Sequence, residues 1–589
     1  MYILGINDGH NSSATIFYNG NLLCAISEER LSRKKNEYGF PLRAINYCLK
    51  VAKIQKKEIN YVAVGTLNLP PKYFFVKRNT TFTVDDYLKE QNQYWYPKIY
   101  KKNNPKYLKI FKDKIQSKKK IFYNMKNIKN EDDTDGMLIS RRSGISKFLG
   151  INEKKINFYD HHTCHAYYGL YAKGDFNKKS IVVTADGGGD GSNGTIWIYN
   201  KNSFKQVYKT NICNIGRMYR YATLSLGFKP TEHEYKIMGL AGYGLKNNKY
   251  YNYANSIYES TLDLKGINYF YKFKPKDNYF YFKDKLKNQR FDTISYAIQN
   301  NTEKLLTKWF NNIYKKYGIS DFIFSGGVAQ NIKASKKILS LKGIKSLFVP
   351  PGPGDESISI GAAYFLISKK LKLKNKKITS MINPYVGSSF DKKDLKFIYK
   401  NSKLKVRKVN NKIVAKILNQ GFPVARFSTN KSEFGPRALG NRSIVASPKD
   451  PQIIHHINES IKIRDFWMPF APSIISTDIN KLLINKKNSF PNFMTTSLDS
   501  TKFAKINIPG ALHPFDRTSR PQVVFKKYNE DYYNLISEFK KISGVGCLLN
   551  TSFNIHGEPI VNSPNDAVKT LIKTDLKYLL IDNLLISKK

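Results

Sequence analysis

The sequence has little cysteine, few acidic residues and no long apolar run, and each shortage excludes a class of protein. Its 589 residues include five cysteines without a CxxC pair, which argues against a disulfide framework or a thiolate zinc site. No run of 18 or more apolar residues occurs, so no transmembrane helix is expected. Residues 1–10 lack a basic segment followed by an apolar core, so we expect no secretory signal. These shortages predict a protein of the reducing cytoplasm.

Acidic residues are scarce beside basic ones. Asp and Glu number 45 against 98 Lys and Arg, for a formal net charge of +53. Such a charge first suggests binding to nucleic acid or to a membrane surface. Only 16 of the basic residues are arginine, however, and arginine is favoured on base-reading and phosphate-clamping surfaces. The lysines accompany abundant Asn, Ile, Tyr and Phe, a composition typical of an AT-rich genome, so the net charge alone identifies no partner.

The apolar content predicts a folded protein of several domains. Hydrophobic residues make up 41% and aromatic residues 14%, too much for a disordered chain. Apolar runs predict strands at 2–7, 14–18, 22–27, 180–184, 195–199, 321–324 and 346–349. Helical patterns start near residue 301, after residue 331 and at 358–368. The alternation is typical of an α/β fold.

Three Lys- and Asn-rich stretches interrupt this alternation. From about residue 72 to 142 the chain shows little periodicity, which predicts an irregular insertion with peripheral or partner-specific roles. A second such stretch runs from about 247 to 290. A Lys/Asn run at 369–377 is the expected domain boundary.

A histidine pair stands in AspHisHisThrCysHisAla, residues 160–166. On a helix, His161 and His165 would lie on one face, about 5–6 Å apart at Cβ, the spacing that two ligands of one metal need. Two ligands make no site, so oxygen ligands are required. Asp186 and Asp355 are candidates because both lie in glycine-rich loops after expected strands. Such a set suits iron, manganese or zinc; the alternative is a capping or core histidine cluster.

Glycine-rich loops at 186–191 and 325–331 follow two of the expected strands. Their backbone N–H groups could approach an anion closely, and the second loop opens a helix whose N-terminus favours phosphate. Neither loop matches GxxxxGK[ST] or GxGxxG, and strand-to-helix turns need glycine anyway. Together with the first hairpin loop, they predict the three-loop arrangement of a split, actin-like nucleotide fold.

Arginine is concentrated between residues 426 and 520, which contain six of the 16. The segment GluPheGlyProArgAlaLeuGlyAsnArgSerIle, 433–444, places Arg437 and Arg442 around a glycine turn, where they could donate to a phosphate. Lys462 and Arg464 follow, then the segments 469–472, 520–522 and 550–559. Structural ion pairs remain the alternative for any single arginine, but the concentration favours a phosphate-rich ligand.

These segments resemble the O-carbamoyltransferases of the nodulation-protein U and cephamycin/tobramycin carbamoyltransferase type. The resemblance covers nearly the whole chain and is weakest at 72–142. Its blocks are the C-terminal segments named above together with, in order, AsnAspGlyHisAsnSerSerAla (7–14), SerGluGluArgLeuSerArgLysLys (27–35), residues 160–166, ThrAlaAspGlyGlyGlyAspGly (184–191), LysIleMetGlyLeuAlaGlyTyrGly (236–244) and SerGlyGlyValAlaGlnAsn (325–331).

The resemblance implies an α/β enzyme with two stages. Residues 1–375 would form an ASKHA (actin/ribonuclease H-like) half of two subdomains, and residues 376–589 an α/β YrdC-like domain. The C-terminal domain would make carbamoyl-adenylate and pyrophosphate from carbamoyl phosphate and ATP with magnesium. The N-terminal domain would then move the carbamoyl group to a hydroxyl of a small, sugar-like acceptor.

The resemblance also implies roles for single residues. His161 and His165 match a metal-binding pair of iron type, or for another divalent metal, which Asp186 and Asp355 would complete. His10 matches the position beside the reacting hydroxyl, where a neutral imidazole could act as general base, and Asp8 could orient the acceptor. The matches to ligand-binding positions are Gly326, Gly327 and Asn331 for the adenylate, and Arg437, Arg442, Lys462, Arg520 and Ser552 for carbamoyl phosphate and ATP, with Lys462 also catalytic.

One departure and two other hypotheses stay open. Met468 stands where the family carries arginine, which removes one phosphate contact unless Arg464 replaces it.

The second hypothesis keeps the fold but makes tRNA or modified DNA the acceptor, and binding with a steep salt dependence would support it. The third, an ASKHA sugar kinase or ATPase, lacks the usual phosphate loops. No membrane partner is expected, and a homodimer stays open.

Overall fold

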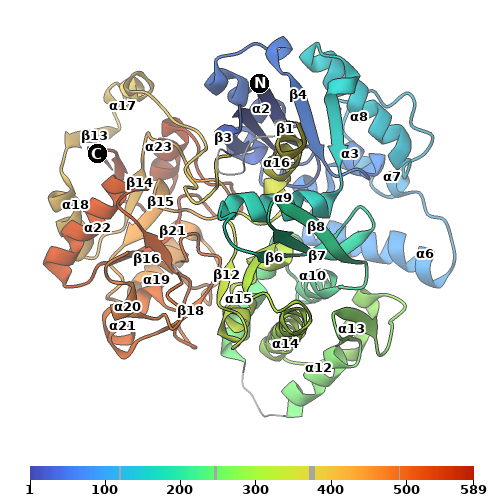
Figure 1. Ribbon diagram of the computed structural model, residues 1–589. Coiled ribbons are helices and arrows are strands. Elements are labelled where there is room, and N and C mark those ends of the chain that lie inside the picture. The colour runs from blue at the N-terminus through green and yellow to red at the C-terminus, as the bar shows by residue number, and fades with distance from the viewer. Residues whose placement is uncertain (118–120, 245–248, 371–377, 490) are drawn as a thin grey trace. The chain divides into compact units, whose positions relative to one another are not determined.

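The computed structural model describes residues 1–117, 121–244, 249–370, 378–489 and 491–589 (Figure 1). The chain divides into two compact units, residues 1–382 and 383–589. The boundary predicted at residues 375 and 376 falls within 371–377, outside the described residues. Within the described ranges, none of the helices is both long enough and apolar enough to cross a membrane.

Two five-stranded sheets of the same topology form the framework of the N-terminal unit (Figure 1). In each sheet three successive strands form an antiparallel meander, and two later strands add in parallel beside the first. The first sheet has the order β3-β2-β1-β4-β5 and the second β8-β7-β6-β11-β12. This repeated order agrees with the predicted ASKHA-type half of two related subdomains. The strands are β1 (Tyr2–Asn7), β2 (Ser13–Tyr18), β3 (Asn21–Ser27), β4 (Tyr61–Gly65), β5 (Ile156–Tyr159), β6 (Ser180–Gly189), β7 (Ser192–Asn200), β8 (Ser203–Thr210), β11 (Asp321–Ser325) and β12 (Ser346–Phe348).

The strands form where the sequence predicts them. The runs at 2–7, 14–18, 22–27, 180–184, 195–199, 321–324 and 346–349 all become strands, and β6 continues to Gly189, past its predicted end. Every residue of β1 after Tyr2 is buried, as expected for a strand covered on both faces. The long helix expected from residue 301 begins earlier, at Phe291. The main helices of this unit are α2 (Leu42–Ala52), α8 (Thr134–Leu149), α9 (His161–Lys173), α10 (Ile215–Ser225), α11 (Glu234–Leu240), α12 (Lys249–Glu259), α13 (Asn278–Lys285), α14 (Phe291–Tyr317), α15 (Ile332–Ser340) and α16 (Ile358–Lys370).

Residues 72–142 are mostly short helices, so the prediction of an irregular insertion is wrong. Several of the helices have only four to six residues, and the longer run at 84–100 includes a π-helical stretch that shifts the 3.6-residue period. The aromatic side chains of the segment form a hydrophobic cluster of their own, around the buried Tyr87, Tyr94 and Tyr107. The helices are α3 (Pro71–Val76), α4 (Arg78–Thr81), α5 (Val84–Lys89), a π-helix (Glu90–Trp95), α6 (Tyr96–Tyr100), α7 (Tyr107–Ile110) and the first part of α8. The second stretch, 247–290, likewise contains α12, α13 and the hairpin of β9 (Leu262–Lys265) and β10 (Asn268–Tyr271).

Helices α9 and α16 pack together, with α9 against the second sheet and α16 against the first, and glycines permit the closest contacts of α16. A Cβ atom on Gly361 of α16 would lie 2.0 Å from the carbonyl oxygen of Cys164 in α9. A Cβ atom on Gly5 of β1 would lie 2.1 Å from the carbonyl oxygen of Ser359, and one on Gly65 of β4 would lie 1.9 Å from Ile358. These contacts fix the first turn of α16 against both α9 and the sheet.

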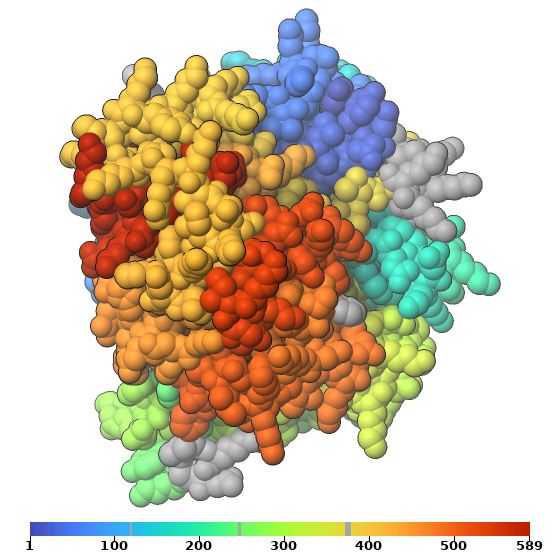
Figure 2. Space-filling view, turned by 90° about the vertical axis from the view of Figure 1, so that its left-hand side faces the viewer, coloured from blue at the N-terminus to red at the C-terminus, as the bar shows by residue number. Residues whose placement is uncertain are grey.

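The C-terminal unit is built on an eight-stranded mixed sheet. Successive residues of its central strands point to opposite faces, so Ala425 belongs to one hydrophobic cluster and Val424 to the other, and Leu549 and Leu548 divide in the same way. Helices α18 (Asn411–Asn419) and α22 (Glu530–Ser543) cover one face, and α23 (Pro564–Lys573) covers the other. Figure 2 shows the surface of this unit in yellow to red. The strands, in order across the sheet, are β13 (Leu404–Lys408), β23 (Leu584–Lys588), β22 (Tyr578–Ile581), β14 (Val424–Phe427), β15 (Arg442–Ala446), β21 (Cys547–Ser552), β16 (Ala471–Ile475) and β20 (Gln522–Val524).

The close approach at Gly361 predicts that Gly361→Ala destabilises the protein. The new methyl group must push α16 away from Cys164, and overpacking of this kind costs about 1–3 kcal/mol. Urea unfolding followed by circular dichroism measures the loss. Lys369→Ala, at an exposed position of the same helix, is the control and should stay within about 0.5 kcal/mol of the parent protein. Equal stability of the two variants would contradict this account of the packing.

Candidate functional site

The predicted histidine pair lies at the start of α9. Asp160 caps this helix by accepting a hydrogen bond of 2.8 Å from the backbone N–H of Thr163. The helix begins at His161, so His161 and His165 are one turn apart and project to the same side. Their Nε2 atoms are 3.2 Å apart, and both side chains are buried. The spacing predicted for two ligands of one metal is therefore present.

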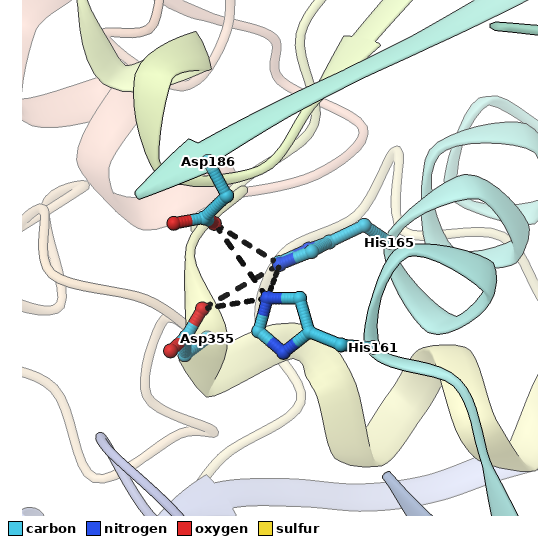
Figure 3. Close-up of side chains that lie close together, drawn as sticks. All are labelled: His161, His165, Asp186 and Asp355. Carbon is cyan, nitrogen blue, oxygen red and sulfur yellow. Dashed lines mark hydrogen bonds and ion pairs between the residues drawn. The ribbon is translucent and has the colours of Figure 1, made fainter. Parts of the chain in front are cut away.

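Two carboxylates face these imidazoles (Figure 3). Asp186 is on β6, and Asp355 begins the 3-10 turn that leads into α16. His165 Nε2 lies 3.3 Å from the Asp186 carboxylate and 3.5 Å from that of Asp355. The corresponding distances from His161 Nε2 are 3.9 and 3.6 Å. One ligand atom from each of the four residues falls within 4.8 Å of all the others, which makes a candidate metal centre.

Residues outside this group orient the imidazoles. Thr66 Oγ1 lies 3.1 Å from His161 Nδ1, so a hydrogen bond there leaves Nε2 facing the carboxylates. Thr66 itself has φ 67°, a left-handed conformation that is strained for a β-branched residue. Gly189 lies so close to the His161 ring that an added Cβ would be 2.4 Å from its Cγ. His165 Nδ1 is buried and has no hydrogen-bond partner among the described residues.

The electrostatics of the group favour a cation. Burial alone would lower the pKa of His165, but its hydrogen bonds to Asp186 and Asp355 outweigh burial and raise that pKa to about 9. The same imidazoles hold the pKa of the Asp186 carboxyl well below its ordinary value, against the opposing effect of burial. Two nitrogen and two oxygen donors around one point, in a field that holds positive charge, fit a divalent transition metal.

The third histidine of the motif is not part of this group. His162 is buried, with Nδ1 2.8 Å from Thr184 Oγ1 and Nε2 3.1 Å from the carbonyl oxygen of Ser192. Burial, with smaller contributions from the neighbouring imidazoles, lowers the pKa of His162 to about 3, so it stays neutral. Its role is the structural one that the sequence left open for the histidine cluster.

His10 lies in the loop between β1 and β2 and is electrostatically coupled to the same carboxylates. Its Nδ1 atom is 2.7 Å from Nδ2 of Asn79, at the start of α4. Burial lowers the pKa of His10, and Arg220 and Arg78 act in the same direction against Asp355 and Asp186. His10 is therefore a neutral imidazole near pH 7, as its predicted role requires.

Asp8 is in a different environment from the one predicted. Its carboxylate is fully buried and accepts hydrogen bonds from Arg141 Nε at 2.8 Å, Arg141 Nη2 at 2.7 Å and the Tyr123 hydroxyl at 2.6 Å. Arg141 also donates to the backbone carbonyls of Thr66 and Leu67. Since no atom of Asp8 is exposed, direct contact with an acceptor is not supported. Asp8 instead ties the His10 loop to α8 and to the segment after β4.

The glycine loop predicted to bind the adenylate adjoins the histidine and aspartate group. The backbone N–H of Gly327 donates to Asp186 Oδ2 at 2.7 Å, and Gly326 adopts φ 94° against the carbonyl of Ala185. Asn331 caps α15, and its amide is paired with that of Gln299 at 2.9 and 3.0 Å. The loop thus orients Asp186; its contact with adenosine stays a prediction.

In the C-terminal unit, the structure brings Lys462 and Ser552 together. Lys462 ends a π-helix (Ile457–Lys462), and its Nζ donates to the Ser552 carbonyl at 2.5 Å and lies 3.1 Å from Ser552 Oγ. Asn554 accepts from the same ammonium through its side-chain oxygen at 2.6 Å and its carbonyl at 3.1 Å.

Three arginines of the same unit form a positively charged group. Burial lowers the pKa of Arg520 well below its usual range, and the nearby guanidinium groups of Arg437 and Arg464 lower it further. Arg520 forms no hydrogen bond or ion pair with the described part of the chain. The mutual influence of these guanidinium groups favours a bound anion beside them. Arg464 donates to Asn458 and its guanidinium lies 4.5 Å from the centre of the Phe470 ring, while Met468 is buried. Replacement of the family's arginine by Arg464 stays a prediction.

Arg442 does not belong to this group, contrary to the prediction. Its guanidinium is fully buried and donates to the carbonyls of Ser428 at 2.5 Å and Asn441 at 2.9 Å. It also stacks 3.8 Å from the centre of the Phe427 ring. Because Arg442 donates to backbone carbonyls and has no exposed surface, its role is structural, and a phosphate has no access to it.

Several residues of the site carry no sequence signal. Thr66, Asn79 and Arg141 act through contacts to residues that are distant in the chain, and none of the three belongs to a motif of regular spacing. Asn554 differs from these residues, because it lies two residues after Ser552 in the C-terminal segment 550–559, where the motif itself indicates a ligand-binding role.

The geometry of the histidine and aspartate group predicts that His165→Ala abolishes metal binding. Removing one of four ligands from a buried site should lower the bound metal, measured by elemental analysis of the purified protein, by at least about tenfold. His162→Gln is the control, because His162 is equally buried but contributes no ligand. Metal content that is unchanged in His165→Ala, or lost equally in both folded variants, would refute the assignment.

The chain is similar along its length to several known proteins. An uncharacterized protein of Methanocaldococcus jannaschii is 32% identical over 610 residues, which cover 100% of this chain and 99% of that protein. Nodulation protein NolNO of Sinorhizobium fredii is 27% identical and covers 98% of this chain and 79% of its own length. Nodulation protein NolO of Bradyrhizobium diazoefficiens is 30% identical, covering 73% of this chain and 79% of its own length.

Solved structures are more distant. Component A of the (R)-2-hydroxyglutaryl-CoA dehydratase of Acidaminococcus fermentans matches 63% of this chain and 98% of its own, with 13% identity and a TM-score of 0.32. Full-length HypF in its phosphate- and nucleotide-bound form matches 41% of this chain and 42% of its own, with 16% identity and a TM-score of 0.24. TM-scores this low carry no structural argument.

Family models, by contrast, match most of the chain. The model described as carbamoyltransferase N-terminus matches residues 2–364, and the one described as carbamoyltransferase C-terminus matches residues 415–588. The first alone covers more than half of the sequence, and nodulation protein NolNO is similar over 98% of the chain, hence over both units. The protein therefore belongs to the carbamoyltransferase family and is a transferase of carbamoyl groups.

Proposed function

We propose that the protein is an ATP-dependent O-carbamoyltransferase whose acceptor is a small, sugar-like molecule with a reactive hydroxyl. One observation carries the proposal: the C-terminal unit holds a group of three arginines in which Arg520 has no partner among the described residues. Such a group suits a ligand with several negative charges, and ATP with carbamoyl phosphate supplies them. The proposed division of labour assigns activation to residues 376–589, as a YrdC-like domain, and transfer to residues 1–375.

In the first stage, the carbamate oxygen of carbamoyl phosphate attacks the α-phosphorus of ATP. Pyrophosphate leaves, and the phosphoryl group of carbamoyl phosphate passes to water, so the products are carbamoyl-adenylate, pyrophosphate and phosphate. Arg437, Arg464 and Arg520 would bind the phosphate oxygens, and Lys462, held between Ser552 and Asn554, would neutralise charge at the reacting phosphorus. Magnesium would accompany ATP.

In the second stage, the acceptor hydroxyl attacks the carbamoyl carbon of the adenylate and AMP leaves. His161, His165, Asp186 and Asp355 would hold a divalent metal, iron by the family resemblance, which supplies Lewis-acid polarisation when bound. His10 would lie beside the reacting hydroxyl, since it is coupled to Asp186 and Asp355 and is neutral near pH 7. Gly326 and Gly327 would contact the adenosine side.

Pyrophosphate release tests the first stage. Purified protein with ATP, carbamoyl phosphate and magnesium should release pyrophosphate, and Lys462→Ala should slow the release by about 10²–10³-fold, because a charge that stabilises the transition state is lost. Lys449→Ala, exposed in the same unit, is the control. No pyrophosphate from the parent protein would rule out the adenylate.

His10→Ala tests the separation of the two stages. Pyrophosphate release should stay within about twofold of the parent value, while transfer of the carbamoyl group should fall by about 10²–10⁴-fold. Mass spectrometry of a panel of hydroxylated sugars, searched for a gain of one carbamoyl group, measures the transfer. Equal loss in both assays would contradict separate sites.

A further inference from the structure

The side chain of Asn79 connects His10 to a buried ion pair. Its Nδ2 atom lies 2.7 Å from His10 Nδ1. Its Oδ1 atom accepts from the Tyr87 hydroxyl at 3.1 Å and from Arg78 Nη1 at 3.3 Å. Asn79 is 8% exposed, so these contacts are made away from solvent.

The ion pair fixes which end of the Asn79 amide faces His10. Arg78 donates through Nε at 2.7 Å and Nη2 at 2.5 Å to the carboxylate of Glu90, which is fully buried. The guanidinium is therefore immobile, and it can only donate. If the amide were turned over, its NH₂ group would face Nη1 and two donors would meet. The oxygen of Asn79 must face Arg78, so its NH₂ group must face His10.

This orientation determines where neutral His10 carries its proton. A nitrogen that accepts a hydrogen bond from an amide NH₂ offers a lone pair, so Nδ1 is unprotonated and the ring proton is on Nε2. The ring is neutral near pH 7, because burial lowers its pKa and outweighs the opposing effect of Asp355 and Asp186. Nε2, the ring nitrogen of His10 that does not face Asn79, is thus an N–H donor and has no free lone pair that could accept a proton.

We propose that Asn79 is a positioning residue that holds neutral His10 as the Nε2–H tautomer, so that His10 donates a hydrogen bond in carbamoyl transfer and does not act as the general base. This inference rests on the proposed function and replaces the role suggested by the family resemblance. Attack on the carbamoyl carbon places negative charge on its oxygen, and a preorganised N–H group stabilises that charge.

The proton balance of the transfer step follows from this assignment. The acceptor oxygen forms a bond to the carbamoyl carbon, and the bond from that carbon to the adenylate oxygen breaks with its electron pair. The proton of the acceptor hydroxyl passes to a phosphate oxygen of the departing AMP, which gains charge as the bond breaks. His10 keeps its own proton throughout, so the step needs no second base.

The tautomer can be measured without any acceptor. Nitrogen NMR of protein labelled with ¹⁵N-histidine, with the His10 signals assigned through His10→Gln, should show a protonated Nε2 and an unprotonated Nδ1. Asn79→Asp replaces the NH₂ donor with an acceptor and should move the proton to Nδ1. Asn103→Ala, at an exposed position of the same segment, is the control and should leave the tautomer unchanged. A proton on Nδ1 in the parent protein would overturn the proposal.

Rate measurements distinguish His10 as a hydrogen-bond donor from His10 as a general base. The Gln side chain can donate from its NH₂ group but is too weak a base to accept a proton, so His10→Gln should transfer the carbamoyl group at least about tenfold faster than His10→Ala. Both protonation states of His10 carry an Nε2 proton, so the rate should show no acidic limb from His10, whereas a base would lose about tenfold per pH unit below its pKa. Equal inactivity of the two variants with such a limb would refute the donor role. Absence of transfer in every protein would count against the proposed function, and the NMR result would still decide the tautomer.

Discussion

The candidate metal centre depends on the close approach of α9 and α16 at Gly361. The two helices come from the two halves of the N-terminal unit: α9 follows the last strand of the first sheet, and α16 follows the last strand of the second. Because Gly361 lets α16 lie directly on the backbone of Cys164, Asp355 reaches the imidazole of His165. A duplicated topology thus yields one site, to which the first subdomain contributes histidines and the second contributes carboxylates.

Sequence patterns were most reliable where a structure is local. Apolar runs located the strands, and the i, i+4 spacing located the histidine pair, because both depend on a few consecutive residues. Residues 72–142 could not be interpreted in this way. Their order comes from contacts such as Lys72 with Asp132, across 60 residues, and from aromatic packing between helical segments that include the π-helical stretch Glu90–Trp95. No short window of sequence contains that information.

The arginines illustrate a second limit on predicting the role of a residue from sequence. Arg437 and Arg442 stand five residues apart and were given the same predicted role, yet one contributes to a group of cations and the other is buried on Phe427 with its donors on backbone carbonyls. Residue type and spacing are the same for an anion-binding arginine and a structural one. Burial and the supply of acceptors distinguish them, and both depend on the tertiary fold.

The two units have opposite charge requirements. In the N-terminal unit, two carboxylates face two imidazoles closely enough to raise the pKa of His165 to about 9 in spite of burial, so the group favours a bound cation. In the C-terminal unit, burial depresses the pKa of Arg520 and the guanidinium groups of Arg437 and Arg464 lower it further, so the group favours a bound anion. Uncompensated buried charge is costly, and a ligand of the opposite sign relieves that cost. The net charge of +53 is therefore a poor guide to partners, because the informative charges are these few buried and half-buried ones, whose signs differ between the units.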